Sequence, residues 1–256
     1  MPARIAFLGT NRYTAAATVL VASSAVSALP VAASQNQDRS YVWRSTTDTI
    51  VQTIDIDLGS VLAVSAVALA NVALLGTGVV ELYERGDAGA AGAATLVATL
   101  PAANAYTRTT FAFFASQSHR HWQLKWTNPT AASDYAELGY AFLGVEVEPA
   151  VNVIVPAALA RQDPAVAGAS VDGQKTFATR TKYYAGAWEF DHVLEAQLEQ
   201  LQTLFEALGT SGAHFVVLDT ALAWTCWYVR MAGPVGVRLE LATGRYSVAV
   251  PWEEVR

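Results

Sequence analysis

Two pairs of alternating residues carry side chains that could perform chemistry. His119 and His121 are separated by one residue, and alternate residues of a strand project to one side, so both imidazoles could reach one cation. No third ligand follows nearby in the sequence, and the alternative is a histidine pair at the surface or rim of a sheet. We therefore predict no metal site.

Asp55 and Asp57 form the second pair, and paired carboxylates can serve acid–base chemistry. Apolar residues at 54, 56 and 58 alternate with them, which is the period of a half-buried strand. We interpret the two acids as the solvated face of that strand. A hydrolase that uses Asp55 or Asp219 remains a third hypothesis for the function.

Aromatic residues could offer flat faces to a sugar ring. One set could form a stacking platform or pack in a core, and we favour the core because two of its members lie in an alternating strand; the set is Trp122, Trp126, Tyr135 and Tyr140. Tyr41 and Trp43 lie in a polar segment, and aromatic residues on loops are the better candidates for ligand contacts.

The usual sequence signatures of enzymes and cofactor sites are absent. The chain has no glycine-rich phosphate loop, no paired cysteines, no nucleophile elbow and no His-Glu-x-x-His motif. Its one cysteine, Cys226, stands between aromatic residues, and we predict a small buried side chain there. We expect no enzyme activity and no cofactor.

The amino-acid composition argues against several further classes of function. Of the 256 residues, 53% are hydrophobic and 15% charged, which is enough apolar material for one large core or two modest ones. The net charge of -6 disfavours nucleic-acid binding. The apolar stretch 13–33 is interrupted by polar residues and Pro30, so we predict neither a secretory signal nor a membrane span.

The first 150 residues read as an antiparallel β-sandwich. Short apolar segments of strand length recur between glycine, asparagine and aspartate clusters, and we expect about eight strands before residue 156. Separate strands are predicted at 54–58, 62–69, 111–114 and 122–126. The stretch 151–175 has prolines, glycines and no usable period, and is predicted to be a linker or extended arm.

Residues 176–256 are predicted to form a smaller α+β domain. Leucines and Phe205 recur at three- and four-residue steps over 191–208, which predicts one amphipathic helix with Asp191 as N-cap and Gly209 as its stop. A strand is expected at 176–184 before the helix. Further strands are expected after it at 215–218, 224–231, 235–241 and 246–250, the last two joined by a hairpin turn.

The motifs of the first domain appear in a familiar order. They are Tyr41-Val-Trp43-Arg44-Ser45, Asp57-Leu-Gly59, Ala70-Asn71 and Arg120-His-Trp122. This order resembles the discoidin or galactose-binding-like β-sandwich. The resemblance implies a glycan site at the loops, with Tyr41, Trp43, Arg44 and Asn71 as the candidate ligand residues.

Two further sets of motifs resemble phage proteins. Leu138-Gly-x-x-Phe142-Leu-Gly144 is similar to the closing strand of this sandwich in minor tail proteins of siphophages. The order Arg180-x-x-Tyr183, Trp188-x-Phe190, helix, Phe215-Val-Val-Leu218 is similar to the split barrel of distal tail proteins.

These resemblances imply a structural protein of the virion, made in the host cytoplasm and placed in the tail tip or baseplate. They imply a homo-oligomeric ring and partners among the tail tube, tail hub and tape measure proteins. The candidate interface aromatics are Trp224, Trp227, Tyr228 and Trp252, with core burial as the alternative. The alternative function is a carbohydrate-binding module that recognises a host surface glycan.

Overall fold

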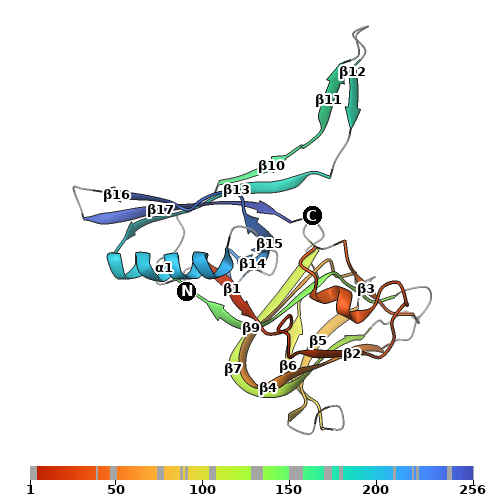
Figure 1. The fold of residues 1–256 in the computed structure, drawn as a ribbon. Coiled ribbons are helices and arrows are strands. Elements are labelled where there is room, and N and C mark those ends of the chain that lie inside the picture. The colour runs from red at the N-terminus through yellow and green to blue at the C-terminus, as the bar shows by residue number, and fades with distance from the viewer. Residues whose placement is uncertain are drawn as a thin grey trace. The chain divides into compact units, whose positions relative to one another are not determined.

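The computed structural model describes most of the chain. The described residues are 5–38, 40–46, 51–73, 78–86, 89, 92–103, 108–127, 135–149, 158–169, 175–178, 181–209, 212–220, 222, 225–240 and 244–255. Within these ranges the protein is mostly antiparallel β-strand with one α-helix (Figure 1). The predicted fold class, mainly β with a single amphipathic helix, is confirmed.

The chain divides into two units. Unit 1 comprises residues 1–149 and 214–228, and unit 2 comprises 150–213 and 229–256. The sequence analysis placed the domain boundaries at 150 and 176, and it did not predict that the chain returns to unit 1 at residues 214–228. It returns because β14 (His214–Val217) pairs antiparallel with β1 (Ala6–Asn11). Such a long-range pairing leaves no local signal in the sequence.

Unit 1 is built from antiparallel strands. In addition to β1 and β14 they are β2 (Val19–Ala22), β3 (Trp43–Arg44), β4 (Val51–Ala70), β5 (Val79–Glu84), β6 (Thr95–Leu100), β7 (Thr109–Thr127), β8 (Glu137–Leu138) and β9 (Tyr140–Val147). The sheet order is β14-β1-β9-β4-β7-β5-β6, with β2 added to β4 and β3 paired with β8. A 3-10 helix, η1 (Val31–Gln35), follows β2.

Two long strands replace the four short ones predicted at 54–58, 62–69, 111–114 and 122–126. β4 continues past Gly59, which has φ 77°, and its pairing with β7 shifts register between Asp57 and Leu62. The two strands curve together in Figure 1. The glycine therefore bends a strand here and does not end it, because the left-handed conformation introduces an irregularity into a ladder that resumes on both sides.

Both halves of β4 contribute to one core. Ile54 and Ile56 from the first half join Val67 and Leu69 from the second in a single apolar cluster. Tryptophans fill the same cluster, and the rings of Trp43 and Trp126 lie 5.2 Å apart. The core positions predicted for Trp122, Trp126 and Tyr140 are confirmed, whereas Tyr135 remains 38% exposed.

Unit 2 is a sheet with one helix packed on it. Its elements are β10 (Ala158–Gln162), β11 (Val166–Ala169), β12 (Lys175–Ala178), β13 (Tyr183–Val193), α1 (Glu195–Leu208), the end of β15 (Cys226–Met231), β16 (Gly236–Glu240) and β17 (Arg245–Glu254). β17 pairs with β13 on one side and with β16 and the end of β15 on the other. β10 and β11 lie in the stretch predicted to be a linker.

The core of unit 2 lies between the helix and the sheet. Leu198, Leu201, Leu204 and Phe205 of α1 are buried, and α1 packs against β17 (Figure 1). Trp188 of β13 stacks on Trp252 of β17 with ring centres 5.2 Å apart. The predicted apolar stripe of the helix therefore faces the sheet.

The N-cap of the helix lies three residues later than predicted, at Leu194 and not at Asp191. Asp191 belongs to β13, which pairs with β17 as far as Val193, so Leu194 is the N-cap. The Leu194 N–H donates to Oε1 of Gln197 at 2.9 Å. At the other end the prediction is confirmed: Gly209 has φ 64° and donates its N–H to the carbonyl of Phe205. The strand predicted at 176–184 is instead β12 and the start of β13.

Candidate functional site

Three segments far apart in the sequence meet at one end of unit 1. β3 pairs with β8, with Trp43 opposite Leu138 and Arg44 opposite Glu137. The Ala73 N–H donates to the carbonyl of Glu137, which joins the segment after β4 to the same place. This end is therefore built on backbone hydrogen bonds, and Arg44 and Glu137 lie side by side on it.

Arg44, Tyr135 and Glu137 form what we call the loop-end cluster. The Arg44 Nε donates to Oε1 of Glu137 at 2.5 Å, and Nη2 forms an ion pair with the same oxygen. The guanidinium carbon lies 4.0 Å from the centre of the Tyr135 ring, within the range of a cation–π contact. The Glu137 side chain is only 11% exposed, against 36% for Arg44. A nearly buried carboxylate thus holds a surface guanidinium against an aromatic ring.

The other predicted ligand residues have different surroundings. Tyr41 is 55% exposed, three residues before Arg44. Asn71 lies just after β4 with φ 53°, in the left-handed region that asparagine tolerates better than most residues. Trp43 is fully buried, its ring is tilted against that of Trp126, and its Nε1 donates to the carbonyl of Ser24 at 3.0 Å. We therefore correct the expectation that Trp43 contacts a ligand, because its ring has no exposed surface.

The sequence analysis placed Tyr135 in a set that could form a stacking platform or pack in the core, favoured the core, and did not single out Glu137. The sequence does contain one signal. Tyr135 and Glu137 come directly before the Leu138-Gly motif, which places both residues at the start of a strand. Their contact with Arg44, 93 residues away from Glu137, appears only in the fold.

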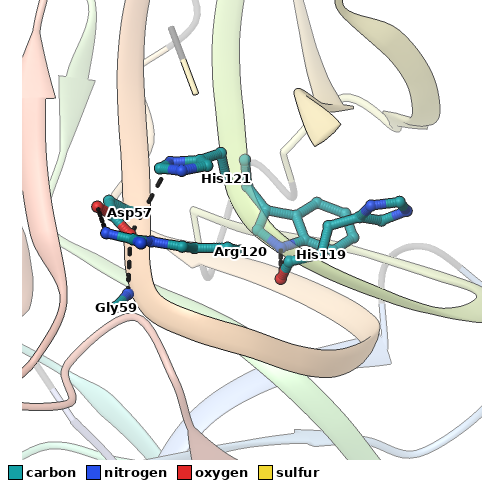
Figure 2. Close-up of polar contacts among 6 residues, drawn as sticks. Asp57, Gly59, His119, Arg120 and His121 are labelled. Atoms are coloured by element: carbon teal, nitrogen blue, oxygen red, sulfur yellow. Dashed lines mark hydrogen bonds and ion pairs between the residues drawn. The ribbon is translucent and has the colours of Figure 1, made fainter. Parts of the chain in front are cut away.

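Asp57 lies on the outer face of the sheet and is held by an arginine (Figure 2). Arg120 donates from Nε to Oδ1 at 2.7 Å and from Nη2 to Oδ2 at 2.8 Å. The Arg120 hydrogen bond is the main reason that the pKa of Asp57 is lowered to about 2, and the Gly59 N–H contributes. A carboxylate that stays ionised to such low pH is a poor proton donor or base near neutral pH.

The two histidines do not converge. The His121 Nδ1 lies 3.9 Å from Oδ1 of Asp57, whereas the His119 Nδ1 lies 3.6 Å from Oε2 of Glu84. Figure 2 shows the two rings pointing to different sides. Among the described residues no three His, Cys, Asp or Glu side chains gather as a metal site.

Asp219, the other carboxylate considered for hydrolysis, lies in the turn after β14. Its N–H donates to the Thr225 Oγ1 at 3.1 Å, and the Thr225 hydroxyl donates to its carbonyl at 2.8 Å. These backbone contacts shape the turn, and Asp55 and Asp57 lie on another part of unit 1.

The predicted interface aromatics are core residues where the structure describes them. Trp227, Tyr228 and Trp252 are 6%, 0% and 1% exposed, and Trp224 lies outside the described residues. Tyr228 packs between Phe215 and Tyr140, with ring centres 4.8 and 5.1 Å away, and donates its hydroxyl to the carbonyl of Gln37. Trp252 stacks on Trp188 of its own unit, and all three described residues are buried, as the alternative of core burial predicts.

No protein-family model matches the sequence, and no curated protein matches it. Several solved structures resemble the backbone of about half of the chain. A chitosan-binding module of a chitosanase/glucanase from Paenibacillus sp. IK-5 is 18% identical, with a TM-score of 0.43, over 53% of this chain and 99% of that one.

Two modules from Clostridium perfringens are similar to the same extent. A family 32 carbohydrate-binding module of NanJ, solved with galactose, is 14% identical with a TM-score of 0.42, over 56% of this chain and 99% of that one. A second module, solved with GalNAc-β-1,3-galactose, is 11% identical with a TM-score of 0.44, over 53% of this chain and all of that one.

In the part of this chain that the structure describes, no helix is long and apolar enough to span a membrane.

Proposed function

We propose that unit 1 is a carbohydrate-binding domain and that the loop-end cluster contacts the sugar. One observation carries the proposal: the guanidinium of Arg44 lies against the 38% exposed ring of Tyr135 and is fixed by Glu137. A flat apolar surface and a positioned donor are thus presented together at one end of the unit.

The chemistry of this cluster suits a sugar ring. Sugar hydroxyls both donate and accept hydrogen bonds, and the cluster offers guanidinium N–H donors together with the phenol oxygen of Tyr135. The exposed part of the tyrosine ring suits the C–H face of a pyranose. Because Glu137 already holds Arg44, binding would order few additional side chains, which lowers its entropic cost.

Binding of the full chain to a glycan array, followed by calorimetry on each hit, tests the proposal. Tyr135→Ala is expected to weaken binding about tenfold or more, as truncation of a central tyrosine does at binding sites. Glu137→Gln should weaken it less, because the shape remains while the ion pair that fixes Arg44 is lost. Tyr183→Ala, at a half-buried tyrosine of unit 2, is the matched control. Binding that survives Tyr135→Ala unchanged would exclude this site.

A second proposal concerns unit 2 and assembly in a phage tail. In the described part of the chain, β16 pairs with β17 only, and it exposes Val237 and Leu239 at 43% and 47%. An edge strand with apolar side chains is a surface that favours association. We infer that copies of the protein associate through β16, in a tail ring that contacts the tail tube, tail hub and tape measure proteins.

Light scattering on the purified full chain tests this second proposal. We expect a discrete oligomer, and Val237→Lys with Leu239→Lys should convert it to a monomer because two buried charges at a strand interface are costly. Val61→Lys, at a 57% exposed position of β4 in unit 1, is the control. A monomer at high micromolar concentration would contradict self-association through β16.

A further inference from the structure

A pocket of about 270 Å³ lies on the outer face of unit 1, apart from the residues of the loop-end cluster. We call it the sheet-face pocket. It spans β2, β4 and β7 and reaches the residue after β5, and the side chains that matter for its chemistry are Val19, Val21, Asp55, Asp57, Arg85 and His121. Its volume lies just below the roughly 300 Å³ at which drug-sized ligands begin to fit, so it suits one small ring.

One wall of the pocket is apolar. Val19 and Val21 of β2 are 58% and 60% exposed. The pairing of β2 with β4 sets Val19 opposite Asp57 and Val21 opposite Asp55. Two exposed isopropyl groups therefore stand directly beside two carboxylates.

The polar groups are held in place by their neighbours. The Gln123 Nε2 donates to Oδ1 of Asp55 at 2.6 Å, and the Arg85 Nη2 lies 3.8 Å from the same oxygen. Arg85 also donates from Nη1 to the carbonyl of Gly92 at 3.2 Å. The Arg85 and His121 side chains are each only 18% exposed, so they present fixed polar atoms from a mostly buried position.

The charges of this region balance. Asp55 and Asp57 face two guanidinium groups, Arg85 and Arg120. An anion would meet two carboxylates, and a cation would have to compete with arginines that are already paired. Uncharged hydroxyl groups can use both the acceptors and the donors without disturbing either ion pair.

We propose that the sheet-face pocket is a second ligand site, which binds one neutral polyhydroxylated ring of the size of a hexose. The C–H face of the ring lies on Val19 and Val21, and its hydroxyl groups donate to Asp55 and accept from His121 or Arg85. The site goes beyond the proposed function, because none of its residues belongs to the loop-end cluster.

Methyl NMR of the full chain with labelled valines tests this site directly. The probes are D-galactose, D-glucose and D-mannose, with D-glucuronate and D-glucosamine as charged counterparts. We expect saturable shifts of the Val19 and Val21 methyl signals with at least one neutral hexose. The absence of saturable shifts with all three, or saturation with the charged sugars only, overturns the proposal.

Variants separate this pocket from the loop-end cluster. Asp55→Asn should weaken the neutral hexose about tenfold, since it removes a charged acceptor. Glu81→Gln, on β5 and outside the pocket lining, should leave the affinity unchanged. Val21→Ser at its exposed position should also weaken binding and keeps the test valid if Asp55→Asn disturbs the fold.

The Tyr135→Ala variant keeps the two proposals apart. If the sheet-face pocket is a site of its own, Tyr135→Ala leaves the valine shifts intact even where it removes binding on the glycan array. Loss of the valine shifts in Tyr135→Ala, or unchanged affinity in Asp55→Asn and Val21→Ser, would overturn the second site. Failure of array binding alone counts only against the loop-end cluster.

Discussion

Arg120 engages both carboxylate oxygens of Asp57, with Nε 2.7 Å from Oδ1 and Nη2 2.8 Å from Oδ2. The two residues come from neighbouring strands, β7 and β4, at the point where the ladder shifts register after Asp57. The pair therefore fastens the two long strands next to the bend at Gly59. A two-point contact of this kind is more specific than a single ion pair.

The pair predicts a pH dependence of stability. The folded pKa of Asp57 is about 2, below its ordinary value of 3.8, so the carboxylate adds stability that is fully present above about pH 4. That contribution is lost as the pH falls from about 4 to 2. Urea unfolding of the protein and of Asp57→Asn should differ at pH 5 and converge toward pH 2. A difference that stays constant over this range would contradict the shift.

Substitution of Trp43 tests whether this residue belongs to the core or contacts a ligand. Because its ring is fully buried beside Trp126, Trp43→Ala should lower the free energy of unfolding by about 3 to 5 kcal/mol. Tyr41→Ala, at a 55% exposed position two residues away, should change it by less than about 0.5 kcal/mol. Denaturant titration of both variants measures this, and a mild effect of Trp43→Ala would mean that the ring is not in the core.

Gly144 in β9 is required by close packing. A Cβ there would overlap the carbonyl oxygen of Thr10 and lie 2.8 Å from Cζ of Phe142. Gly144→Ala should therefore destabilise the protein by about 1 to 3 kcal/mol, the usual cost of overpacking. Gly9→Ala is the matched control, because its Cβ would meet only Val147 Cγ2 at an ordinary 3.5 Å. Equal thermal midpoints for the two variants would refute the close approach.

Local patterns accounted for much of the fold. Alternation placed Ile54, Ile56 and Leu58 inward, and the leucine spacing found α1, because both periods are properties of a short window. Glycine was misleading at position 59, since a glycine with positive φ can end a strand or bend it. Only the pairing partner decides, and β7 lies about 60 residues farther along the chain.

The candidate site was harder to predict than the fold. Arg44 was singled out from its loop, whereas its fixing partner Glu137 and the ring of Tyr135 come from the opposite end of unit 1's sequence. Trp43 was misjudged because a polar segment surrounds it, although its own side chain points into the core. Side-chain direction in a two-residue strand such as β3 has no period from which it could be inferred.

Cys226 should not react in the folded protein. It is fully buried, and burial raises the pKa of its thiol to about 12, so almost no thiolate exists at neutral pH. Iodoacetamide at pH 8 should leave the native chain unmodified and label it once in denaturant. Rapid labelling under native conditions, read by mass spectrometry, would show that the site opens.

Variants at Trp252 and Leu239 distinguish residues that pack inside unit 2 from residues that bind a second copy of the protein. Trp252 is 1% exposed and stacks on Trp188, so Trp252→Ala should lower the free energy of unfolding by about 3 to 5 kcal/mol even in dilute protein. Leu239 is 47% exposed on β16, so Leu239→Ala should cost less than about 0.5 kcal/mol in dilute protein. If β16 is the association surface, the effect of Leu239→Ala grows with protein concentration, because association adds stability by mass action. If the unfolding midpoints of the unsubstituted protein, Trp252→Ala and Leu239→Ala are all independent of protein concentration, association through β16 is contradicted. That result would not affect the assignment of Trp252 to the core.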